Sequence, residues 1–367
     1  MPAYQPTPAE TDHLAAFRRQ LLDWYRPADR PMPWKEEADP YLIWLSEIIL
    51  QQTRVEQGLN YYLAFRAAYP TVAELAAAPA DDVMKLWAGL GYYSRARNLR
   101  AAAQKVIADF GGKFPASYDD LLSLPGVGPY TAAAIASFAF GLPHAVLDGN
   151  VYRVLARYLD RATPIDSTPG KHAFTALAQT ALAADRPARY NQAVMDFGAT
   201  VCTPRLPACP TCPLAADCLA YRNGRVEQLP VKTKKTKVRD RFFHYLVLNQ
   251  GDRVWIHRRE EQDIWQALYQ FPLLEVDHAE LDRAGLREQP DWRAWFGVGD
   301  EKIELRGKTA ARRHILSHQR IHGVFWELSL PSGIKPSFPD GYRAVKRKNL
   351  STFAFPKLID SYLSQDC

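Results

Sequence analysis

Residues 124–140 read LPGVGPYTAAAIASFAF, a short turn followed by an apolar stretch. Gly126 and Gly128 flank Val127, so the backbone can turn sharply there. The turn exposes its N–H groups beside a helix that we expect from about Ala132, and such an arrangement binds phosphate without regard to base sequence. A turn that only joins two helices has the same composition. The stretch lacks the phosphate-binding lysine of a P-loop, which argues against a nucleotide triphosphate as the ligand.

The regions on either side of this turn predict different secondary structure. Residues 11–110 alternate Ala- and Leu-rich amphipathic stretches with short Pro or Gly breaks, a pattern typical of helices. Residues 242–248 and 254–259 flank a turn of sequence NQGD and predict a β-hairpin, and residues 324–330 predict a further strand. We therefore expect a helical region up to about residue 230 and an α+β region after it.

Length and composition predict a soluble protein of two or three domains. The chain has 367 residues, 47% of them apolar, which is enough for ordinary hydrophobic cores. Its longest apolar run, residues 132–142, is only about half the length that spans a bilayer, so we expect a buried helix there. The first residues, MPAYQPTPAETDH, lack the basic start and apolar core of a signal peptide. We therefore expect an intracellular, cytoplasmic protein.

Basic residues are concentrated in one segment. The formal net charge of +6 is modest and by itself only weakly favours a polyanionic partner. Residues 231–241, VKTKKTKVRDR, contain six Lys or Arg residues and one Asp. Such a run fits a solvated linker between the two regions, and it also fits a contact for a polyanionic partner.

Four of the five cysteines follow the spacing C-x6-C-x2-C-x5-C, at Cys202, Cys209, Cys212 and Cys218. A zinc ribbon usually offers two close pairs, whereas only Cys209 and Cys212 form one here. The outer two reach in from either side, as a bulky iron–sulfur cluster requires. Disulfides are not favoured, because nothing in the sequence indicates an oxidising compartment. We expect a four-thiolate site for an iron–sulfur cluster, with zinc as the alternative.

Two carboxylic acids are candidate functional groups. Glu47 lies within YLIWLSEIIL (residues 41–50), a helix that is apolar on nearly every side. A buried carboxyl must be paired with a basic group or stay protonated near neutral pH, and a general acid requires the second state. Asp148, within LDGN (residues 147–150), fits an ordinary helix N-cap or turn residue.

The motifs occur in an order that resembles a known family. The chain carries LSEIILQQT (45–53), GLGYYSRARNL (89–99), LDGNVYRVLAR (147–157) and NQAVMDFG (191–198). With the turn and the cysteines, they resemble the helix-hairpin-helix DNA glycosylases, and among these most resemble the MutY-type adenine DNA glycosylases, along almost the whole chain. The resemblance implies an all-α catalytic domain over 1–228, divided into a six-helix barrel (about 31–140) and an iron–sulfur subdomain (1–30 with 141–228), a basic linker over 229–241 and a Nudix-like α/β domain over 242–367.

Two positions separate the branches of this family. The bifunctional endonuclease III branch has a catalytic lysine where this chain has Tyr130, and a Thr-His pair where it has Gly149-Asn150. A lysine amine forms a Schiff base with the sugar and drives strand cleavage, which a phenol cannot do. The resemblance therefore implies a monofunctional glycosylase, which removes a base and leaves the backbone intact.

The resemblance also assigns catalytic roles. Glu47 would be the general acid that protonates an adenine flipped out of the duplex. Asp148 would stay ionised and stabilise the oxocarbenium-like sugar, directly or through a transient covalent bond. Tyr130 and Asn150 would support the same sugar, and the four cysteines would hold a [4Fe-4S] cluster. Spacing in the sequence does not show that residues 47 and 148 converge.

Further residues match positions that contact DNA in the family. Gln52 and Tyr92 match residues that wedge into the duplex; from the sequence alone, Gln52 also fits a helix-surface amide and Tyr92 a core aromatic. The turn residues Gly126, Val127 and Gly128 would bind the DNA backbone. The implied partner of the monomeric protein is double-stranded DNA with adenine opposite 8-oxoguanine or guanine.

The last third of the chain resembles the Nudix-like domain with which the family senses 8-oxoguanine, through WQALYQFP (265–272) and Leu316-Ser317-His318. A hydrolytic Nudix enzyme holds metal with an Arg-Glu-x-x-Glu-Glu pattern, which this sequence lacks. We therefore expect Ser317 and His318 to recognise the base, without hydrolysis. Leu316 departs from the family's usual Phe, which puts an aromatic wedge at the damaged base in question.

Two other functions are compatible with these motifs. One is a thymine or uracil mismatch glycosylase of the same superfamily, and the appended third domain favours adenine over it. The other is a DNA-binding iron–sulfur protein without catalysis, against which the presence of both Glu47 and Asp148 argues.

Overall fold

The computed structural model describes residues 4–35, 37–233, 238–297 and 300–364. The chain forms two compact units, Met1–Ala77 with Asn98–Lys234, and Ala78–Arg97 with Lys235–Cys367. Residues 234–237 of the predicted basic segment lie outside the described residues. The domain boundaries expected from the sequence stay predictions.

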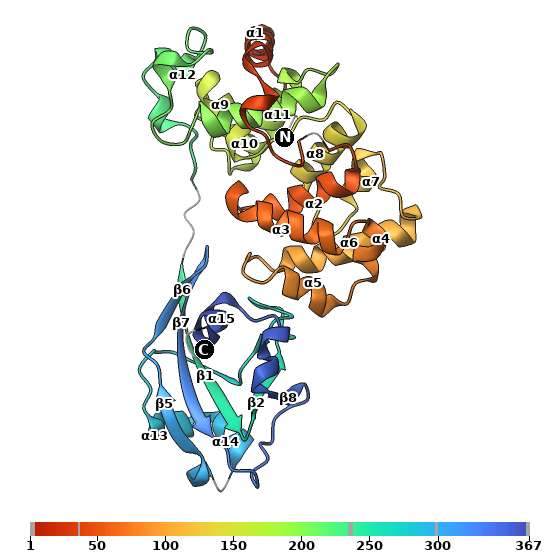
Figure 1. The fold of residues 1–367 in the computed structure, drawn as a ribbon. Helices are drawn as coiled ribbons and strands as arrows, with labels where there is room; N and C mark the ends of the chain where they lie inside the picture. The colour runs from red at the N-terminus through yellow and green to blue at the C-terminus, as the bar shows by residue number, and fades with distance from the viewer. Residues whose placement is uncertain (1–3, 36, 234–237, 298–299, 365–367) are drawn as a thin grey trace. The chain divides into compact units, whose positions relative to one another are not determined.

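The first unit is helical, which confirms the expected texture of this region (Figure 1). Its elements are α1 (Pro8–Trp24), η1 (Pro27–Asp29), α2 (Pro40–Leu50), α3 (Val55–Ala68), α4 (Val72–Ala77), most of α6 (Ser94–Phe110), α7 (Tyr118–Leu122), α8 (Pro129–Phe140), α9 (Gly149–Tyr158), α10 (Thr168–Ala181), α11 (Pro187–Thr200), η2 (Cys209–Thr211), α12 (Leu219–Arg222) and η3 (Val226–Gln228). Helix α2 packs on α3 and α8, and α9 packs on α10, α11 and α12. Among the described residues, no helix is long and apolar enough to cross a membrane.

Helices α2 and α8 are buried on nearly every side. Helix α2 starts at Pro40, and the side chain of Asp39 caps it by accepting a hydrogen bond from the backbone N–H of Tyr41. Helix α8 starts at Pro129 and ends at Gly141, whose φ of 63° is the left-handed conformation of a helix C-cap. Because α8 is rich in alanine, the two backbones can approach closely, and this packing positions the polar residues that the helices carry.

The second unit is an eight-stranded sheet with helices. Its elements are α5 (Ala80–Leu86), β1 (Arg239–Gln250), β2 (Arg253–Arg258), β3 (Tyr269–Gln270), β4 (Leu273–Val276), α13 (Arg283–Glu288), α14 (Pro290–Phe296), η4 (Asp300–Lys302), β5 (Glu304–Lys308), β6 (Arg312–Ile315), β7 (Gln319–Ser329), β8 (Tyr342–Lys346), η5 (Arg347–Thr352) and α15 (Lys357–Leu363). The order is β3-β2-β1-β7-β5, with β4 on β1, β6 on β7 and β8 on β2. Strands β1 and β7 are parallel, and the predicted β1–β2 hairpin is confirmed.

Strand β7 is buried on both faces, because helices cover the sheet on both sides. Val324 and Trp326 pack in one core cluster with residues of α13 and α14. Phe325 points to the other face, where its ring stacks on Tyr362 of α15 with centroids 4.1 Å apart. This alternation follows from the two-residue period of a strand.

Candidate active site

Glu47 and Tyr130 meet where α2 packs against the first turn of α8. The side chain of Glu47 is buried, with 8% of its surface exposed. Burial, opposed by a hydrogen bond with Tyr130 and assisted by the negative charge of Asp148, raises the pKa of Glu47 to about 7. The carboxyl of Glu47 is therefore protonated in a large share of molecules at neutral pH.

Asp148 is the N-cap of α9, as its position in the sequence predicts. Its Oδ1 accepts hydrogen bonds from the backbone N–H groups of Asn150 at 2.9 Å and Val151 at 2.8 Å, and its Oδ2 accepts from Asn150 Nδ2 at 2.8 Å. Burial raises the pKa of Asp148, while these hydrogen bonds and the charge of Arg153 favour the ionised form. Asp148 is thus a half-buried carboxylate held in one orientation.

Glu47, Tyr130 and Asp148 act on one another electrostatically, which places the three groups together. Burial first, and then the charges of Glu47 and Asp148, raise the pKa of Tyr130 well above its usual value. The hydroxyl of Tyr130 also donates to the sulfur of Met195 on α11, at 3.5 Å. The structure therefore brings together two carboxyls that are a hundred residues apart in the chain.

Arg153, which the sequence analysis did not single out, connects this site to the cysteine segment. Its Nη2 donates to Asn150 Oδ1 at 2.8 Å, and its Nε donates to the carbonyl of Cys202 at 2.7 Å. Asn150 in turn holds Asp148. The available signal was the three-residue spacing of Asn150 and Arg153, which places both on one face of a helix.

Asp196 is a second residue that the sequence analysis passed over. It is buried on α11, next to Met195, and forms ion pairs with the ammonium of Lys35 and with Arg30 Nη1, the latter at 2.7 Å. The signal was an acidic residue inside the helical motif NQAVMDFG. Its partners lie some 160 residues away, so the sequence did not indicate the pairing.

The glycine turn between α7 and α8 has the predicted sharp geometry. Gly126 has a φ of 77°, and a Cβ there would lie 2.8 Å from Cβ of Asn98, so this position requires glycine. Val127 is buried and anchors the turn. A Cβ added to Gly128 would meet no atom within 4 Å, so this side of the turn is open.

Gln52 and Tyr92 share an uncommon backbone conformation. Their φ angles are 55° and 48°, a region that costs energy for residues other than glycine and that recurs at functional sites. Gln52 is exposed just after α2 in the first unit, and Tyr92 is exposed in the second. The core-aromatic alternative for Tyr92 is therefore wrong.

The four cysteines of the 202–218 segment line one cavity, together with apolar residues of α9 and α11. All four are free thiols and half-buried. The Sγ of Cys202 accepts from Arg157 Nη1, and that of Cys212 accepts from the backbone N–H of Leu214, both at 3.4 Å. Among the described residues, no three or more His, Cys, Asp or Glu side chains form a group that could hold a single metal ion.

The donor set fits an iron–sulfur cluster. Burial, followed by the neighbouring sulfurs, raises the pKa of Cys212 to about 11, although the N–H of Leu214 opposes the shift. Thiols held this close ionise together only when a positive group compensates their charge, and N–H donors to sulfur are typical of cluster sites.

A further cavity lies within the second unit. Its lining includes Tyr92, Trp265, Leu316, Ser317 and His318. The hydroxyls of Tyr92 and Ser317 are hydrogen-bonded to each other, while the side chains of Ser317 and His318 are otherwise exposed. The structure thus brings Tyr92 together with the two residues that were predicted to recognise a base.

Two segments of the chain match known families. Residues 45–172 match the HhH-GPD superfamily base excision DNA repair protein family, and residues 244–365 match the NUDIX domain. The adenine DNA glycosylase of Homo sapiens is 44% identical over 225 residues, covering 59% of this chain and 41% of the human protein. That of Buchnera aphidicola subsp. Baizongia pistaciae (strain Bp) is 32% identical over 308 residues, covering 83% of this chain and 84% of that protein.

A solved structure of a thermostable thymine-DNA glycosylase is similar to the chain, with a TM-score of 0.55 and 31% identity, over 59% of this chain and 99% of that one. The chain spans less than half of the human relative and most of the Buchnera one. The Buchnera relative matches a longer part of this chain than the thymine-DNA glycosylase does. The chain therefore belongs to the adenine DNA glycosylase family, within the HhH-GPD superfamily of base excision DNA repair proteins.

Proposed function

We propose that this protein removes adenine mispaired with 8-oxoguanine or guanine from duplex DNA in base excision repair. The observation that carries the proposal is the group formed by Glu47, Tyr130 and Asp148, in which one carboxyl has a pKa of about 7 and the other is surrounded by donors that favour its ionised form. Two carboxyls in such different environments can divide acid and electrostatic roles. The relatives named adenine DNA glycosylase support adenine as the base.

The reaction starts from an adenine that has left the stack, because its glycosidic bond is out of reach inside a duplex. Protonated Glu47 donates its proton to a ring nitrogen, so that the base departs neutral as the bond breaks. Positive charge then develops on the sugar, and ionised Asp148 stabilises it electrostatically or through a transient covalent bond. Asn150 fixes the orientation of that carboxylate, and a water molecule supplies the hydroxyl that completes the sugar.

We infer a monofunctional reaction, because Tyr130 offers a phenol where strand cleavage needs an amine. DNA treated with the enzyme should remain intact until hot alkali is added. Strand breaks without alkali, trapped by borohydride as a covalent complex, would contradict this inference.

We propose that Cys202, Cys209, Cys212 and Cys218 hold a [4Fe-4S] cluster. When bound, the cluster would supply a rigid cross-link for the segment between α11 and α12, and it takes no part in the steps above. Purified protein should contain about four irons per chain, and a Cys212→Ser variant should contain far fewer. Stoichiometric zinc without iron in the parent protein would overturn the assignment.

The second unit is proposed to recognise the oxidised base through Ser317 and His318. A hydroxyl and an imidazole can form the few hydrogen bonds that separate 8-oxoguanine from guanine, each worth on the order of 1–3 kcal/mol of discrimination. We further propose that the protein acts as a monomer, because Glu47, Tyr130 and Asp148 of a single chain suffice to form the proposed site. We also propose that it acts on chromosomal DNA in a bacterial cytoplasm, associated with the nucleoid. Light scattering during gel filtration tests the oligomeric state.

A thymine mismatch glycosylase is the second candidate, favoured by the 31% identity to a thymine-DNA glycosylase over 59% of this chain. Single-turnover excision from duplexes with adenine opposite 8-oxoguanine, adenine opposite guanine, and thymine or uracil opposite guanine separates the two. Only the adenine duplexes should react.

Glu47→Gln should slow adenine excision roughly 100- to 10,000-fold, the usual contribution of a general acid. An unchanged rate would remove Glu47 from the mechanism.

A further inference from the structure

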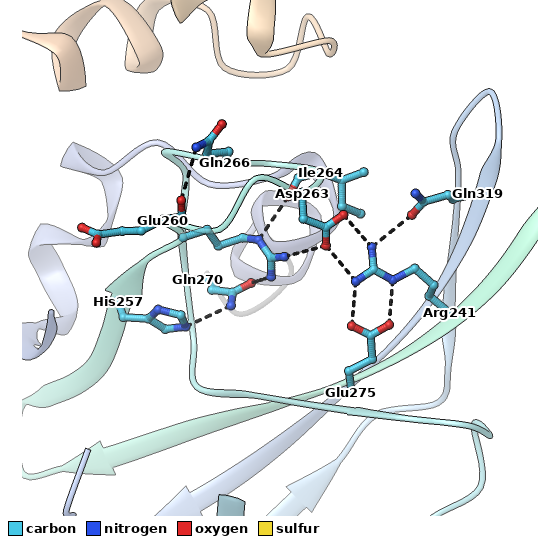
Figure 2. Close-up of polar contacts among 10 residues, drawn as sticks. Arg241, His257, Glu260, Asp263, Ile264, Gln266, Gln270, Glu275 and Gln319 are labelled. Carbon is cyan, nitrogen blue, oxygen red and sulfur yellow. Dashed lines mark hydrogen bonds and ion pairs between the residues drawn. The ribbon is translucent and has the colours of Figure 1, made fainter. Parts of the chain in front are cut away.

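Arg241 is the centre of a buried polar network in the second unit (Figure 2). Only 9% of its surface is exposed, although it belongs to the basic segment that the sequence predicts as a linker. Its Nε and Nη2 donate to the two oxygens of Glu275, at 2.7 and 2.6 Å. Its Nη1 donates to Asp263 Oδ1 at 2.9 Å and to Gln319 Oε1 at 3.2 Å.

Asp263 is shared between two buried arginines. Besides Arg241, its carboxylate accepts from Arg259 Nη2 at 3.0 Å. Arg259 is 5% exposed and also donates to Gln270 Oε1 at 2.9 Å, and Gln270 in turn is hydrogen-bonded to His257 (Figure 2). Burial alone would raise the pKa of Asp263, but the hydrogen bond from Arg241 and the charges of both arginines hold it below its usual value. The carboxylate is therefore ionised, and every hydrogen bond that the two arginines donate is charge-assisted.

This network joins two of the three chain segments that line the Tyr92 and Ser317 cavity. Asp263 and Trp265 line it from the loop between β2 and β3, and Ser317 and His318 line it from the turn before β7. Gln319 follows directly after His318. Strands β1 and β7 are parallel, with Arg239 opposite Gln319. Arg241 follows Arg239 by two residues on β1, so its side chain lies on the same face of the sheet and reaches Gln319 on β7.

The loop between β2 and β3 needs such support, because its backbone is strained. Trp265 and Ala267 have φ angles of 62° and 69°, a region that is unfavourable for residues with a side chain. The turn before β7 is closed by a backbone hydrogen bond from the N–H of Leu316 to the carbonyl of Gln319 at 2.8 Å, and its His318 carbonyl accepts from the N–H of Arg239 at 3.0 Å. These bonds hold its backbone but leave the side chain of Gln319 to Arg241. A rigid guanidinium with its donors in one plane can hold both segments at once.

We propose that Arg241, through Asp263 and Gln319, is a positioning residue for base discrimination: it fixes the two segments so that Ser317 and His318 present their polar groups to the base opposite adenine. The inference rests on the proposed recognition of 8-oxoguanine by these two residues. It adds a residue that touches no base and that acts on discrimination without acting on the excision chemistry.

The test compares Arg241→Lys and Gln319→Met with the parent protein in two assays. The first is the ratio of single-turnover excision rates for adenine opposite 8-oxoguanine and opposite guanine. The second is the dissociation constant for the duplex with guanine divided by that for the duplex with 8-oxoguanine, measured on a non-cleavable adenine analogue, so that both ratios are high when 8-oxoguanine is preferred. Lysine at position 241 keeps the positive charge but lacks the planar set of N–H donors of the guanidinium. Methionine at position 319 removes only the hydrogen bond between Arg241 and the turn before β7. We expect each variant to lower both ratios about tenfold, the worth of one or two charge-assisted hydrogen bonds, with unchanged excision opposite guanine.

Asp300→Asn is the matched control, because Asp300 also accepts a buried hydrogen bond in this unit, from Trp292 Nε1 at 2.9 Å, and it does not line the cavity. It should leave both ratios unchanged at a similar thermal stability. Parent-like ratios in both Arg241→Lys and Gln319→Met would overturn the positioning role. A fall in the thermal midpoint together with weaker binding to both duplexes would show a structural role instead. If the parent protein itself does not distinguish the two duplexes, the proposed recognition fails before the positioning role is tested.

Discussion

At the scale of single residues, the proposed chemistry depends on two carboxyls whose surroundings favour different protonation states. Glu47 lies in an apolar helix, where burial favours its neutral form, and Asp148 caps a helix whose N–H groups favour its charged form. A proton donor and an anion can therefore coexist close together near neutral pH.

The pH dependence of excision follows from these two groups. Glu47 must be protonated, so the single-turnover rate should fall about tenfold per pH unit above its pKa of about 7. Asp148 must be ionised, so the rate should also fall on the acidic side, below a pKa that burial raises. A bell-shaped profile measured by single-turnover kinetics is the expected result. A rate that keeps rising above pH 8 would exclude Glu47 as the acid.

The burial of Glu47 should also make the free energy of unfolding depend on pH. The pKa of Glu47 is raised from 4.5 to about 7 in the folded state, so its contribution to stability is fully present below pH 4.5 and is lost as the pH rises to about 7. At 1.36 kcal/mol per pH unit, the loss is on the order of 3 kcal/mol. Glu47→Gln should remove this dependence, so that its stability relative to the parent improves between pH 4 and pH 8 in thermal unfolding. Parallel curves for the two proteins would contradict the shifted pKa.

At the scale of elements, the packing of α9 on α11 sets the geometry of Asp148. Gly198 on α11 faces Asn150, and a Cβ on Gly198 would lie 2.7 Å from the Cβ of Asn150. The NQAVMDFG motif thus ends in glycine because the two helices approach closely there.

Gly198→Ala should push Asn150 away from its place beside Asp148. We expect excision to slow about tenfold and the protein to lose roughly 1–3 kcal/mol of stability, as overpacking usually costs. Gly333→Ala is the control, because nothing lies within 4 Å of the added atom. Kinetics and thermal unfolding of both variants test the prediction, and parent-like excision by Gly198→Ala would show that Asn150 need not be held so closely.

The sequence predicted individual residues of these elements better than their pairings. Glu47 was recognisable because a carboxyl in an apolar helix is costly, and Asp148 because of its place before a helix. Arg241 was read as part of a solvated linker, since its burial depends on Asp263 and Glu275, whose proximity follows only from the fold of the sheet. Arg153 and Asp196 were missed for the same reason, because a buried charge is understood only when its distant partners are known.

At the scale of the whole molecule, the two units carry different proposed tasks. The proposed catalytic residues lie in the first unit, whereas Tyr92, Ser317 and His318 lie in the second. Excision and the choice of opposite base should therefore be separable.

A chain that ends at residue 233 should still excise adenine opposite guanine but should lose most of its preference for 8-oxoguanine. It retains Ala78–Arg97 without the rest of the second unit, so we also expect weaker DNA binding through Tyr92. The two single-turnover rates and a binding curve test this division. If the shortened chain kept the full preference, the residues that read the damaged base would have to lie before residue 233.

The assignment of Ala78–Arg97 to the second unit also has a consequence for synthesis on the ribosome. About 140 residues separate this segment from Lys235, where the remainder of its unit begins. At roughly 5–20 residues per second, the segment waits about 7 to 30 s before its first partners emerge. During that interval Asp81 lacks the hydroxyl of Tyr269, and Lys85 lacks the carbonyl of Phe353, to which they are hydrogen-bonded in the finished protein. Chaperone dependence of the nascent chain should therefore peak after residue 97 has left the exit tunnel and end once the sheet is complete.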